Sequence, residues 1–305
     1  MRVLVTGARG KVGRAAVVAL QDGGHEVTAT DLHPPEFDRP PEGTAHYVKA
    51  DLTDAGEAYA LIGGASVGEG PRPGPYHAVV HAAALPAPGR HAPHVVFGNN
   101  IMATFNVVEA CVRWGVGRLV NISSETVPGF IFAERPFLPA YLPVDEEHPA
   151  RPQDPYALAK VFGEQLCDAA VARSDLRCIT LRPTWVQNAD SYAPNLGPFL
   201  RDPAMPSVTG WSYVDVLDLA DAIRLAVESD LPGHEVLCVA NPDTIGGRDL
   251  HEAWRAAYPD SATELRPVPR PDASGIDTRK IERLLGWRAG RSWRDYLTVD
   301  GDPRP

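Results

Sequence analysis

The chain has 305 residues, of which 44% are hydrophobic and 22% charged, and its formal net charge is −10 at pH 7. No uninterrupted apolar run approaches the ~20 residues that span a bilayer, and a negative protein disfavours nucleic acid and anionic membranes, whose phosphates are bound through clustered Lys and Arg. The first residues are expected to enter a strand directly, so we expect no signal peptide. Four scattered cysteines form no CxxC pair, so we expect a cytoplasmic protein with reduced core thiols.

The first half of the chain alternates short apolar runs with amphipathic stretches. This rhythm predicts βαβ units around a parallel sheet, in the α/β class. We expect strands at residues 3–5, 25–29, 46–49, 77–81, 118–122 and 177–181, and helices at 11–20, 95–114 and 156–172. Two stretches rich in Gly and Pro, 62–75 and 86–93, are expected to be surface loops.

After Pro183 the pattern becomes less regular. We expect a Pro-rich loop, then a helix at 215–228, a strand at 235–239 and short helices near Leu250 and Ile281. The prediction is a Rossmann-type, doubly wound parallel sheet in residues 1–182, which carries the cofactor and the catalytic side chains, followed by a small substrate-binding lobe in 183–305, from which residues 213–240 return to the core. The tail, 301–305, is expected to be disordered.

A glycine-rich turn lies between the first strand and the first helix. In this context main-chain N–H groups and a helix N-terminus receive a pyrophosphate, and glycine permits the tight turn and the close approach. The residues expected to contact the cofactor here are Gly7, Arg9, Gly10, Lys11, Val12 and Gly13. The alternative, a tight turn with no ligand, is disfavoured by the acidic residue that ends the second strand.

That acidic residue is Asp31. Its carboxylate is placed to accept both ribose hydroxyls of NAD and to repel the 2′-phosphate of NADP, so we expect NAD. NADP stays open, because Arg9 and Lys11 lie in the turn and His33 follows Asp31, so a cation could reach a 2′-phosphate.

A tyrosine and a lysine, Tyr156 and Lys160, stand at i and i+4 and so share one face of a predicted helix. A free phenol titrates near ~10, and an adjacent ammonium favours the phenolate that general-base catalysis needs. Ser123 and Ser124 follow a central strand at its carboxyl end, where ligands of such sheets collect. A hydroxyl there is able to hold the reacting oxygen.

Together these motifs resemble the extended branch of the short-chain dehydrogenase/reductase superfamily, the NAD-dependent epimerase/dehydratase group, over nearly the whole chain. The resemblance implies that Ser124, Tyr156 and Lys160 are catalytic. It also implies that Asp51 and Leu52 contact the cofactor near the adenine. Further cofactor contacts are implied for the three residues after His81, which are Ala82, Ala83 and Ala84, and for Asn100 in a later helix. A C-terminal segment, 277–287, is similar to one in sugar-modifying members, and the resemblance implies a homodimer formed through the helices that begin near Val95 and Tyr156.

The departures from the family pattern disfavour a nucleotide-sugar epimerase and a dehydratase, and they favour a small substrate. Trp185 and Trp211 stand where nucleotide-sugar epimerases place an Asn and an Arg that grip the diphosphate. Dehydratases of the family carry a glutamate two positions after the catalytic Ser or Thr, whereas this chain reads Ser124-Glu125-Thr126. The residues expected to contact the substrate are Glu125, Arg182, Trp185 and Trp211, with Arg182 equally able to form an internal salt bridge.

Two other groups are interpreted as non-functional. His91 and His94 have no carboxylate or thiol at matching spacing, so no metal site is expected. The acidic run 145–147 is expected to be a solvated loop.

The sequence therefore predicts an NAD-dependent oxidoreductase that moves a hydride between the nicotinamide and a small sugar, uronate or other hydroxy/keto substrate. Two alternatives stay open, a nucleotide-sugar 4-epimerase and a non-catalytic NAD(P)-sensing protein.

Overall fold

A seven-stranded sheet organises the first part of the fold. In the computed structural model, which describes residues 1–33, 46–64 and 76–304, the strand order is β10-β7-β5-β4-β1-β2-β3. The strands are β1 (Arg2–Thr6), β2 (Glu26–Asp31), β3 (His46–Lys49), β4 (Ala78–His81), β5 (Arg118–Ile122), β7 (Arg177–Pro183) and β10 (His234–Val239). Neighbouring strands from β3 to β7 pair in parallel, which confirms the predicted fold class.

The chain changes direction across the sheet at β1. From β1 it builds outward to β2 and β3, then returns to the other side of β1 with β4, β5 and β7. β4 and β5 are buried at every position, as expected for central parallel strands covered on both faces. In open sheets of this kind ligands bind beyond the carboxyl ends of the strands at this switch point.

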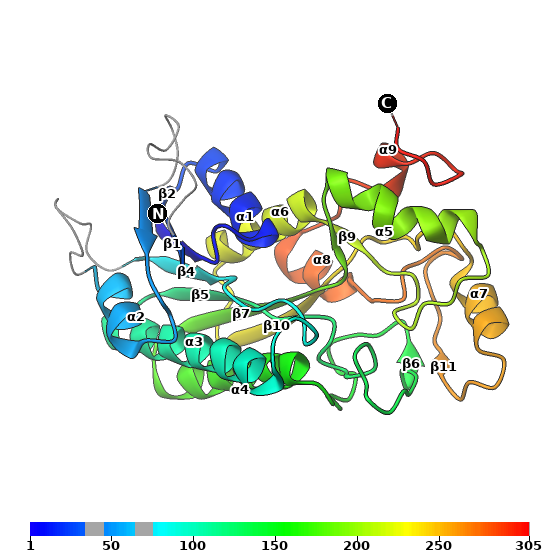
Figure 1. Ribbon diagram of the computed structural model, residues 1–305. Helices are drawn as coiled ribbons and strands as arrows, with labels where there is room; N and C mark the ends of the chain where they lie inside the picture. Colours follow the sequence, from blue (N-terminus) through cyan, green and yellow to red (C-terminus); the bar gives the residue numbers. More distant parts are fainter. Residues whose placement is uncertain (34–45, 65–75, 305) are drawn as a thin grey trace. The chain divides into compact units, whose positions relative to one another are not determined.

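Helices cover both faces of the sheet (Figure 1). On one face lie α1 (Lys11–Asp22) and α6 (Val216–Glu228); on the other lie α2 (Ala55–Ile62), α3 (Pro93–Trp114) and α4 (Pro155–Arg173). The α3 helix packs between α2 and α4. Among the described residues it is also the one helix long and apolar enough to cross a membrane, with half of its apolar stretch buried inside the protein.

The chain divides into two units, each built from several segments. Unit 1 contains residues 1–123, 154–181 and 220–236, and unit 2 contains 124–153, 182–219 and 237–305. The predicted division at residue 182, with residues 213–240 returning to the core, stays a prediction; in the structure residues 220–236 belong to unit 1 and residues 124–153 to unit 2. Each unit has its own hydrophobic core.

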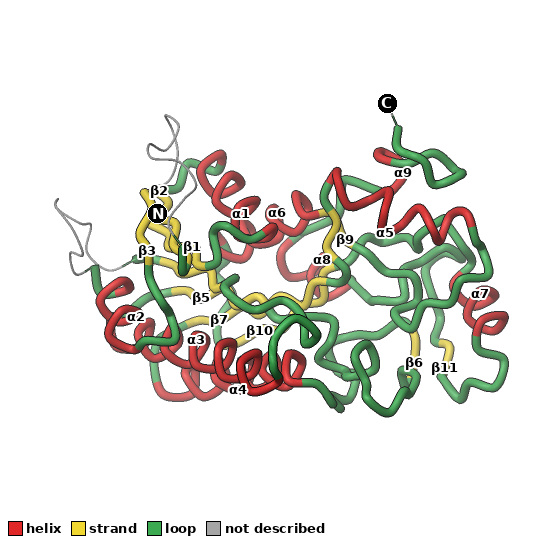
Figure 2. The backbone as a smooth tube through the Cα atoms, viewed as in Figure 1, coloured by secondary structure: helices red, strands yellow, loops and turns green. Residues whose placement is uncertain are grey.

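Unit 2 consists largely of loops around short elements (Figure 2). Its two-stranded sheets pair β6 (Tyr141–Leu142) with β11 (Glu264–Leu265) and β8 (Val186–Gln187) with β9 (Val214–Asp215). Its helices are α5 (Ala189–Arg201), α7 (Leu250–Ala257), α8 (Arg279–Leu285) and α9 (Trp293–Tyr296). Large buried aromatic side chains, among them Tyr192, Trp211, Tyr213 and Trp254, fill its core.

Three local predictions were wrong. Helix α5 replaces the expected Pro-rich loop although it contains Pro194 and Pro198, because Tyr192 and Leu196, one turn apart, are buried in the unit 2 core. Helix α2 was missed, and Ile62, its last residue, had been placed in a loop; residues 65–75 of that expected loop lie outside the described residues. The tail is ordered through residue 304, where the Arg304 N–H donates to the Tyr296 carbonyl over 2.7 Å.

Candidate active site

The glycine turn after β1 leaves no space for side chains. Gly7 has a φ of +65°, and a Cβ there would lie 2.6 Å from the Ala83 main-chain nitrogen at the end of β4. A Cβ on Gly13 would lie 2.2 Å from the Gly7 carbonyl oxygen. Both distances are far below any real contact, so β4 and α1 close on the turn only because both residues are glycine.

The N-terminus of α1 fits an anionic group. Its N-cap is Gly10, which has no side chain to accept the first N–H groups, and the first turn contains no acidic residue. The main-chain N–H groups of the first turn, with the positive end of the helix dipole, then suit a pyrophosphate. Lys11 is the first helical residue, and partial burial lowers the pKa of its ammonium.

Asp31 ends β2 directly beside this turn. Its Oδ2 accepts the Arg9 N–H over 3.0 Å, and its Oδ1 accepts the Leu32 N–H over 2.8 Å. The two hydrogen bonds fix the carboxylate next to the turn in unit 1. This is the combination that NAD requires, an anion site at the helix and a carboxylate at the end of the neighbouring strand.

A chain of hydrogen bonds organises the end of β4. The Thr104 hydroxyl donates to the Asn100 carbonyl and therefore accepts from His81 Nε2 over 3.1 Å. The proton thus lies on Nε2, and His81 Nδ1 accepts from the Thr6 hydroxyl over 2.9 Å. Burial, with the nearby charge of Lys160, lowers the pKa of His81 to about 3, so the ring stays neutral.

The Thr6 oxygen in turn accepts the N–H groups of Ala82 and Ala83, both over 3.2 Å. This fixes the segment after β4 whose residues were predicted to contact the cofactor. Sequence reasoning gave no role to Thr6 or Thr104, because their partners are 75 and 23 residues away along the chain.

Asn100 pairs with both the N–H and the carbonyl of Leu85, over 2.8 and 3.0 Å. It is therefore the residue that holds the loop after β4. A residue that sequence reasoning missed, Asn106, does the same for the loop after β3, by donating from Nδ2 to the carbonyls of Leu52 and Thr53. Asp51 lies in this loop, where it accepts the Thr53 N–H and hydroxyl over 2.9 and 2.7 Å.

Tyr156 and Lys160 lie in the first turns of α4. The helix begins where Asp154 accepts the N–H groups of Tyr156 and Ala157, each over 2.9 Å, and Pro155 occupies its first position. Lys160 Nζ is 5.6 Å from the centre of the Tyr156 ring. The predicted pair therefore lies together, with the ammonium beside the phenol.

Lys160 is also anchored to the sheet. Its Nζ donates to the carbonyl oxygen of Ile122, the last residue of β5, over 2.6 Å. Burial lowers the pKa of Lys160 to about 8, and the charge of Glu164 partly opposes this effect. A buried cation is held at a fixed place next to Tyr156, as activation of a phenol requires.

The two serines after β5 have different surroundings. The Ser123 hydroxyl donates to Glu164 Oε1 over 2.5 Å, so it links β5 to α4. The Ser124 hydroxyl oxygen accepts the Thr126 N–H over 3.2 Å, which leaves its own proton for another acceptor. Of the two, Ser124 is the one able to donate to a ligand.

The remaining candidates belong to unit 2. Arg182 is buried and donates from Nη1 to the Glu146 carbonyl over 3.1 Å. Trp185 keeps 38% of its surface exposed and meets the Phe199 ring edge-on at 6.4 Å. Burial raises the pKa of Glu125 to about 8, against the opposing effect of the Trp185 N–H.

Trp211 does not stand at a ligand surface. It is 1% exposed, its Nε1 donates to the Met205 carbonyl over 3.0 Å, and the Arg248 guanidinium lies 5.4 Å from its ring. The side chain is therefore part of the unit 2 core.

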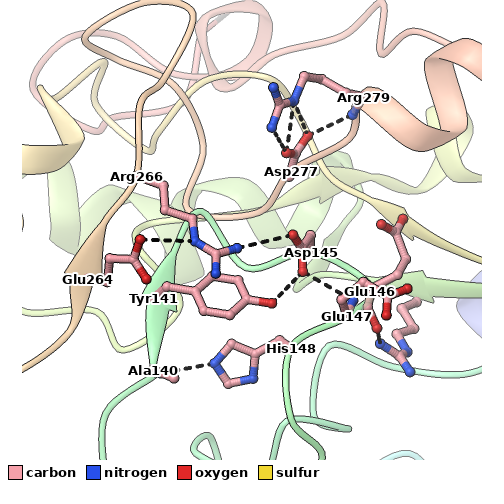
Figure 3. Close-up of polar contacts among 11 residues, drawn as sticks. Ala140, Tyr141, Asp145, Glu146, Glu147, His148, Glu264, Arg266, Asp277 and Arg279 are labelled. Carbon is pink, nitrogen blue, oxygen red and sulfur yellow. Dashed lines mark hydrogen bonds and ion pairs between the residues drawn. The ribbon is translucent and has the colours of Figure 1, made fainter.

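The acidic run 145–147 is more structured than a solvated loop (Figure 3). Asp145 accepts the Tyr141 hydroxyl over 2.6 Å and faces the Arg266 guanidinium, which stacks on the Tyr141 ring. The Glu146 carboxyl accepts the Cys238 N–H over 2.7 Å. Only Glu147 is exposed, so the expectation of a solvated run was wrong for the other two.

All four cysteines are free and buried, as expected from their spacing. Within the described residues no group of three or more His, Cys, Asp or Glu side chains is arranged to hold a metal ion.

Comparison with known proteins identifies the family of this chain. The NAD dependent epimerase/dehydratase family matches residues 3–187. The chain belongs to this family. It is 29% identical to "UDP-glucose 4-epimerase 2" of Arabidopsis thaliana, over 94% of this chain and 90% of the relative. It is 30% identical to "L-arabinose 1-dehydrogenase (NAD(P)(+))" of Haloferax volcanii, over 76% of this chain and 84% of the relative.

A solved structure of a UDP-galactose 4-epimerase has the same fold, with a TM-score of 0.66, 26% identity and coverage of 99% of this chain and 97% of that one. The protein is therefore an enzyme of the extended short-chain dehydrogenase/reductase class, whose relatives are dinucleotide-dependent epimerases and dehydrogenases.

Proposed function

We propose that this enzyme oxidises or reduces a small hydroxylated substrate, a sugar, uronate or similar alcohol, with NAD as its cofactor. The observation that carries the proposal is the pair Tyr156 and Lys160, with the ammonium 5.6 Å from the phenol ring and anchored to Ile122. A structural helix has no need of a buried ammonium beside a nearly buried phenol.

The residues proposed to hold NAD are those of the glycine turn, Asp31, and the loops after β3 and β4. When bound, NAD would supply the hydride acceptor or donor at its nicotinamide ring. The main-chain N–H groups of the first turn of α1, which has no side-chain cap, suit its pyrophosphate. Asp31, which stands beside that turn, favours the unphosphorylated ribose over the 2′-phosphate of NADP.

The chemistry at the substrate is assigned to three side chains. Tyr156 takes the proton of the reacting hydroxyl in oxidation and returns it to the carbonyl oxygen in reduction. Lys160 lowers the cost of the phenolate by its charge. Ser124 donates its hydroxyl proton to the reacting oxygen and so orients it.

Two features narrow the reaction and the substrate. The sequence Ser124-Glu125-Thr126 lacks the glutamate that dehydratases use two positions after the serine, which disfavours dehydration. Trp185 stands with an exposed ring in the loop after β7, where epimerases grip a diphosphate. The arabinose dehydrogenase relative, at 30% identity, agrees with a free sugar.

The second candidate is a nucleotide-sugar 4-epimerase, which the relative from Arabidopsis thaliana favours. A third, a protein that binds NAD(P) without turnover, is disfavoured by the intact Tyr156 and Lys160 pair.

The deciding experiment follows absorbance of the reduced nicotinamide while the protein meets NAD or NADP with free sugars, uronates and simple alcohols. We expect a signal with NAD that Tyr156→Phe abolishes while NAD binding is retained. Silence with every free substrate, together with epimerisation of a nucleotide sugar, would replace the dehydrogenase by the epimerase. Cofactor binding without any turnover would favour the sensing protein.

We propose further that the enzyme is a cytoplasmic homodimer. Large hydrophobic side chains are exposed on α3 and α4, where Val95, Met102, Phe105 and Phe162 are each at least 41% exposed. The first three lie at spacings of seven and three residues and so share one face of α3. In a homodimer the exposed apolar faces of α3 and α4 from the two subunits would pack together and be buried from solvent.

A further inference from the structure

Arg118, the first residue of β5, is a buried cation of unit 1 with unsatisfied donors. Its residue surface is 2% exposed. Within the described ranges it is the one residue with two buried side-chain atoms, Nε and Nη1, that have no hydrogen-bond partner. Its third nitrogen, Nη2, donates to the Ser229 carbonyl over 2.5 Å. A guanidinium is always charged, so buried N–H groups without an acceptor destabilise the protein and call for an explanation.

A second arginine lies beside Arg118 in the sheet. Arg177 is the first residue of β7, and the two positions pair across these parallel strands. Paired residues on neighbouring strands have their side chains on the same face of the sheet. Burial, and then the charge of Arg177, lower the pKa of Arg118. Two cations are therefore held together at the amino edge of β5 and β7.

The opposing charge at this edge is weak. Among the charged side chains that the structure describes, Asp230 is the one carboxylate recorded near Arg118. Its Oδ1 lies 3.6 Å from Arg177 Nη1, and its side chain is fully exposed. This separation is too long for a hydrogen bond, and an exposed ion pair contributes little stability. The Asp230 carboxylate thus marks where an anion is attracted without satisfying Arg118.

We propose that Arg118 and Arg177 form a binding site for a small oxyanion with the size and charge of phosphate or sulfate. Such an ion has several acceptor oxygens and is able to accept from both guanidinium groups at once. It would take the place of the Asp230 carboxylate beside Arg177 and accept the unpartnered N–H groups of Arg118. The Arg177 side chain is 40% exposed, so the ion enters from its side.

This site is separate from the proposed cofactor site. Arg118 and Arg177 begin their strands, whereas the glycine turn follows the carboxyl end of β1, at the other edge of the same parallel sheet. An oxyanion bound to the two arginines would therefore stabilise unit 1 without competing with NAD, because a ligand that binds only the folded state raises stability.

The test is calorimetric titration of sodium sulfate into the protein at constant ionic strength. NADH is present at saturation, so that sulfate does not bind at the glycine turn. We expect about one sulfate per chain, and Arg177→Met should weaken the affinity roughly tenfold or more, the effect of a charge-assisted hydrogen bond. The control is Arg173→Met, which removes an arginine of similar exposure, 46%, that pairs with Glu109. It should bind sulfate as the wild type does.

Two further variants separate binding from folding. Arg118→Met should abolish sulfate binding, and an unchanged affinity for NADH, measured by fluorescence, would show that unit 1 is intact. Asp230→Asn removes the carboxylate that competes with the ion and should tighten sulfate binding several-fold. A gain in affinity cannot result from a variant that fails to fold.

Three outcomes would overturn the site. The first is no sulfate binding by the wild type in the presence of NADH. The second is binding that neither Arg118→Met nor Arg177→Met weakens, because the ion would then lie elsewhere. The third is equal binding of chloride, which has no oxygen atoms to share between two guanidinium groups and would refute the oxyanion class.

Discussion

Lys160 on α4 donates from Nζ to the carbonyl oxygen of Ile122, the last residue of β5, over 2.6 Å. One helical turn further on, Glu164 accepts the hydroxyl of Ser123, the residue after Ile122. The two hydrogen bonds attach one face of α4 to the carboxyl end of β5. The position of the ammonium beside Tyr156 is therefore set by the sheet and does not depend on the helix alone.

The first prediction concerns this lysine and pH. The pKa of Lys160 is about 8 in the folded protein against 10.5 unfolded, so between these values the unfolded state binds more protons and stability rises with pH. Between pH 8 and pH 10.5 the free energy of unfolding of the wild type should rise by on the order of 2 kcal/mol relative to that of Lys160→Met. Urea unfolding of both proteins at pH 7 and pH 10.5 measures it; a constant difference would show that the folded pKa is not lowered.

The glycine turn gives a second prediction. Gly13→Ala would place a Cβ 2.2 Å from the Gly7 carbonyl oxygen, so α1 must move away from β1, at a cost of about 3 kcal/mol. NAD binding and the Tm should both fall. The control is Gly89→Ala in an exposed loop, where a Cβ meets no atom within 4 Å. Fluorescence titration with NADH and thermal unfolding compare the two variants, and equal behaviour would contradict the packing argument.

The third prediction is that Asp31 determines the preference for NADH over NADPH. Asp31→Ser removes the negative charge that accepts the Arg9 N–H beside the glycine turn. Because this charge repels a 2′-phosphate, we expect the ratio of NADPH affinity to NADH affinity to rise on the order of tenfold or more. Asp22→Ser, at the exposed end of α1, serves as the control. Dissociation constants for both reduced cofactors give the ratio, and an unchanged ratio would mean that Asp31 does not contact the ribose.

The fourth prediction concerns the end of α5. Arg248 donates to the carbonyls of Pro203 and Met205 over 2.8 and 3.3 Å and also to those of Phe199 and Asp202. Arg248→Met removes all of these bonds and should lower the free energy of unfolding by about 3 kcal/mol. The control is Arg255→Met at an exposed position on α7, which should lower the free energy of unfolding only slightly. Urea unfolding compares the two variants, and similar losses of stability would show that the hydrogen bonds of Arg248 do not stabilise the end of α5.

The fifth prediction tests the homodimer. Replacing Phe105 and Phe162 together by Glu places two charges on the exposed apolar face of α3 and α4, and the enzyme should become monomeric. Val18→Glu, an equally exposed apolar position on α1, should leave the assembly unchanged. Sedimentation velocity reports the state of each variant. A monomeric wild type, or a dimer that persists in the double variant, would show that this face is not the interface.

The sequence by itself determined the features that depend on neighbours along the chain. Strand, turn and helix around Gly7 to Gly13 follow from local conformational needs, and the i, i+4 spacing of Tyr156 and Lys160 follows from the helical period. The sheet itself was predictable as well, because buried parallel strands such as β4 and β5 are short apolar runs between amphipathic helices.

Only the tertiary structure distinguished residues of the same type by their surroundings. The resemblance assigned the catalytic role to Ser124, but only the structure shows that Ser123 donates its hydroxyl to Glu164. Trp185 and Trp211 had the same prediction, and only the structure shows that the core of unit 2 encloses Trp211. Helix α5 forms against its prolines because the core buries Tyr192 and Leu196. Burial and long-range hydrogen bonds are properties of contacts between distant segments, and no local pattern carries them.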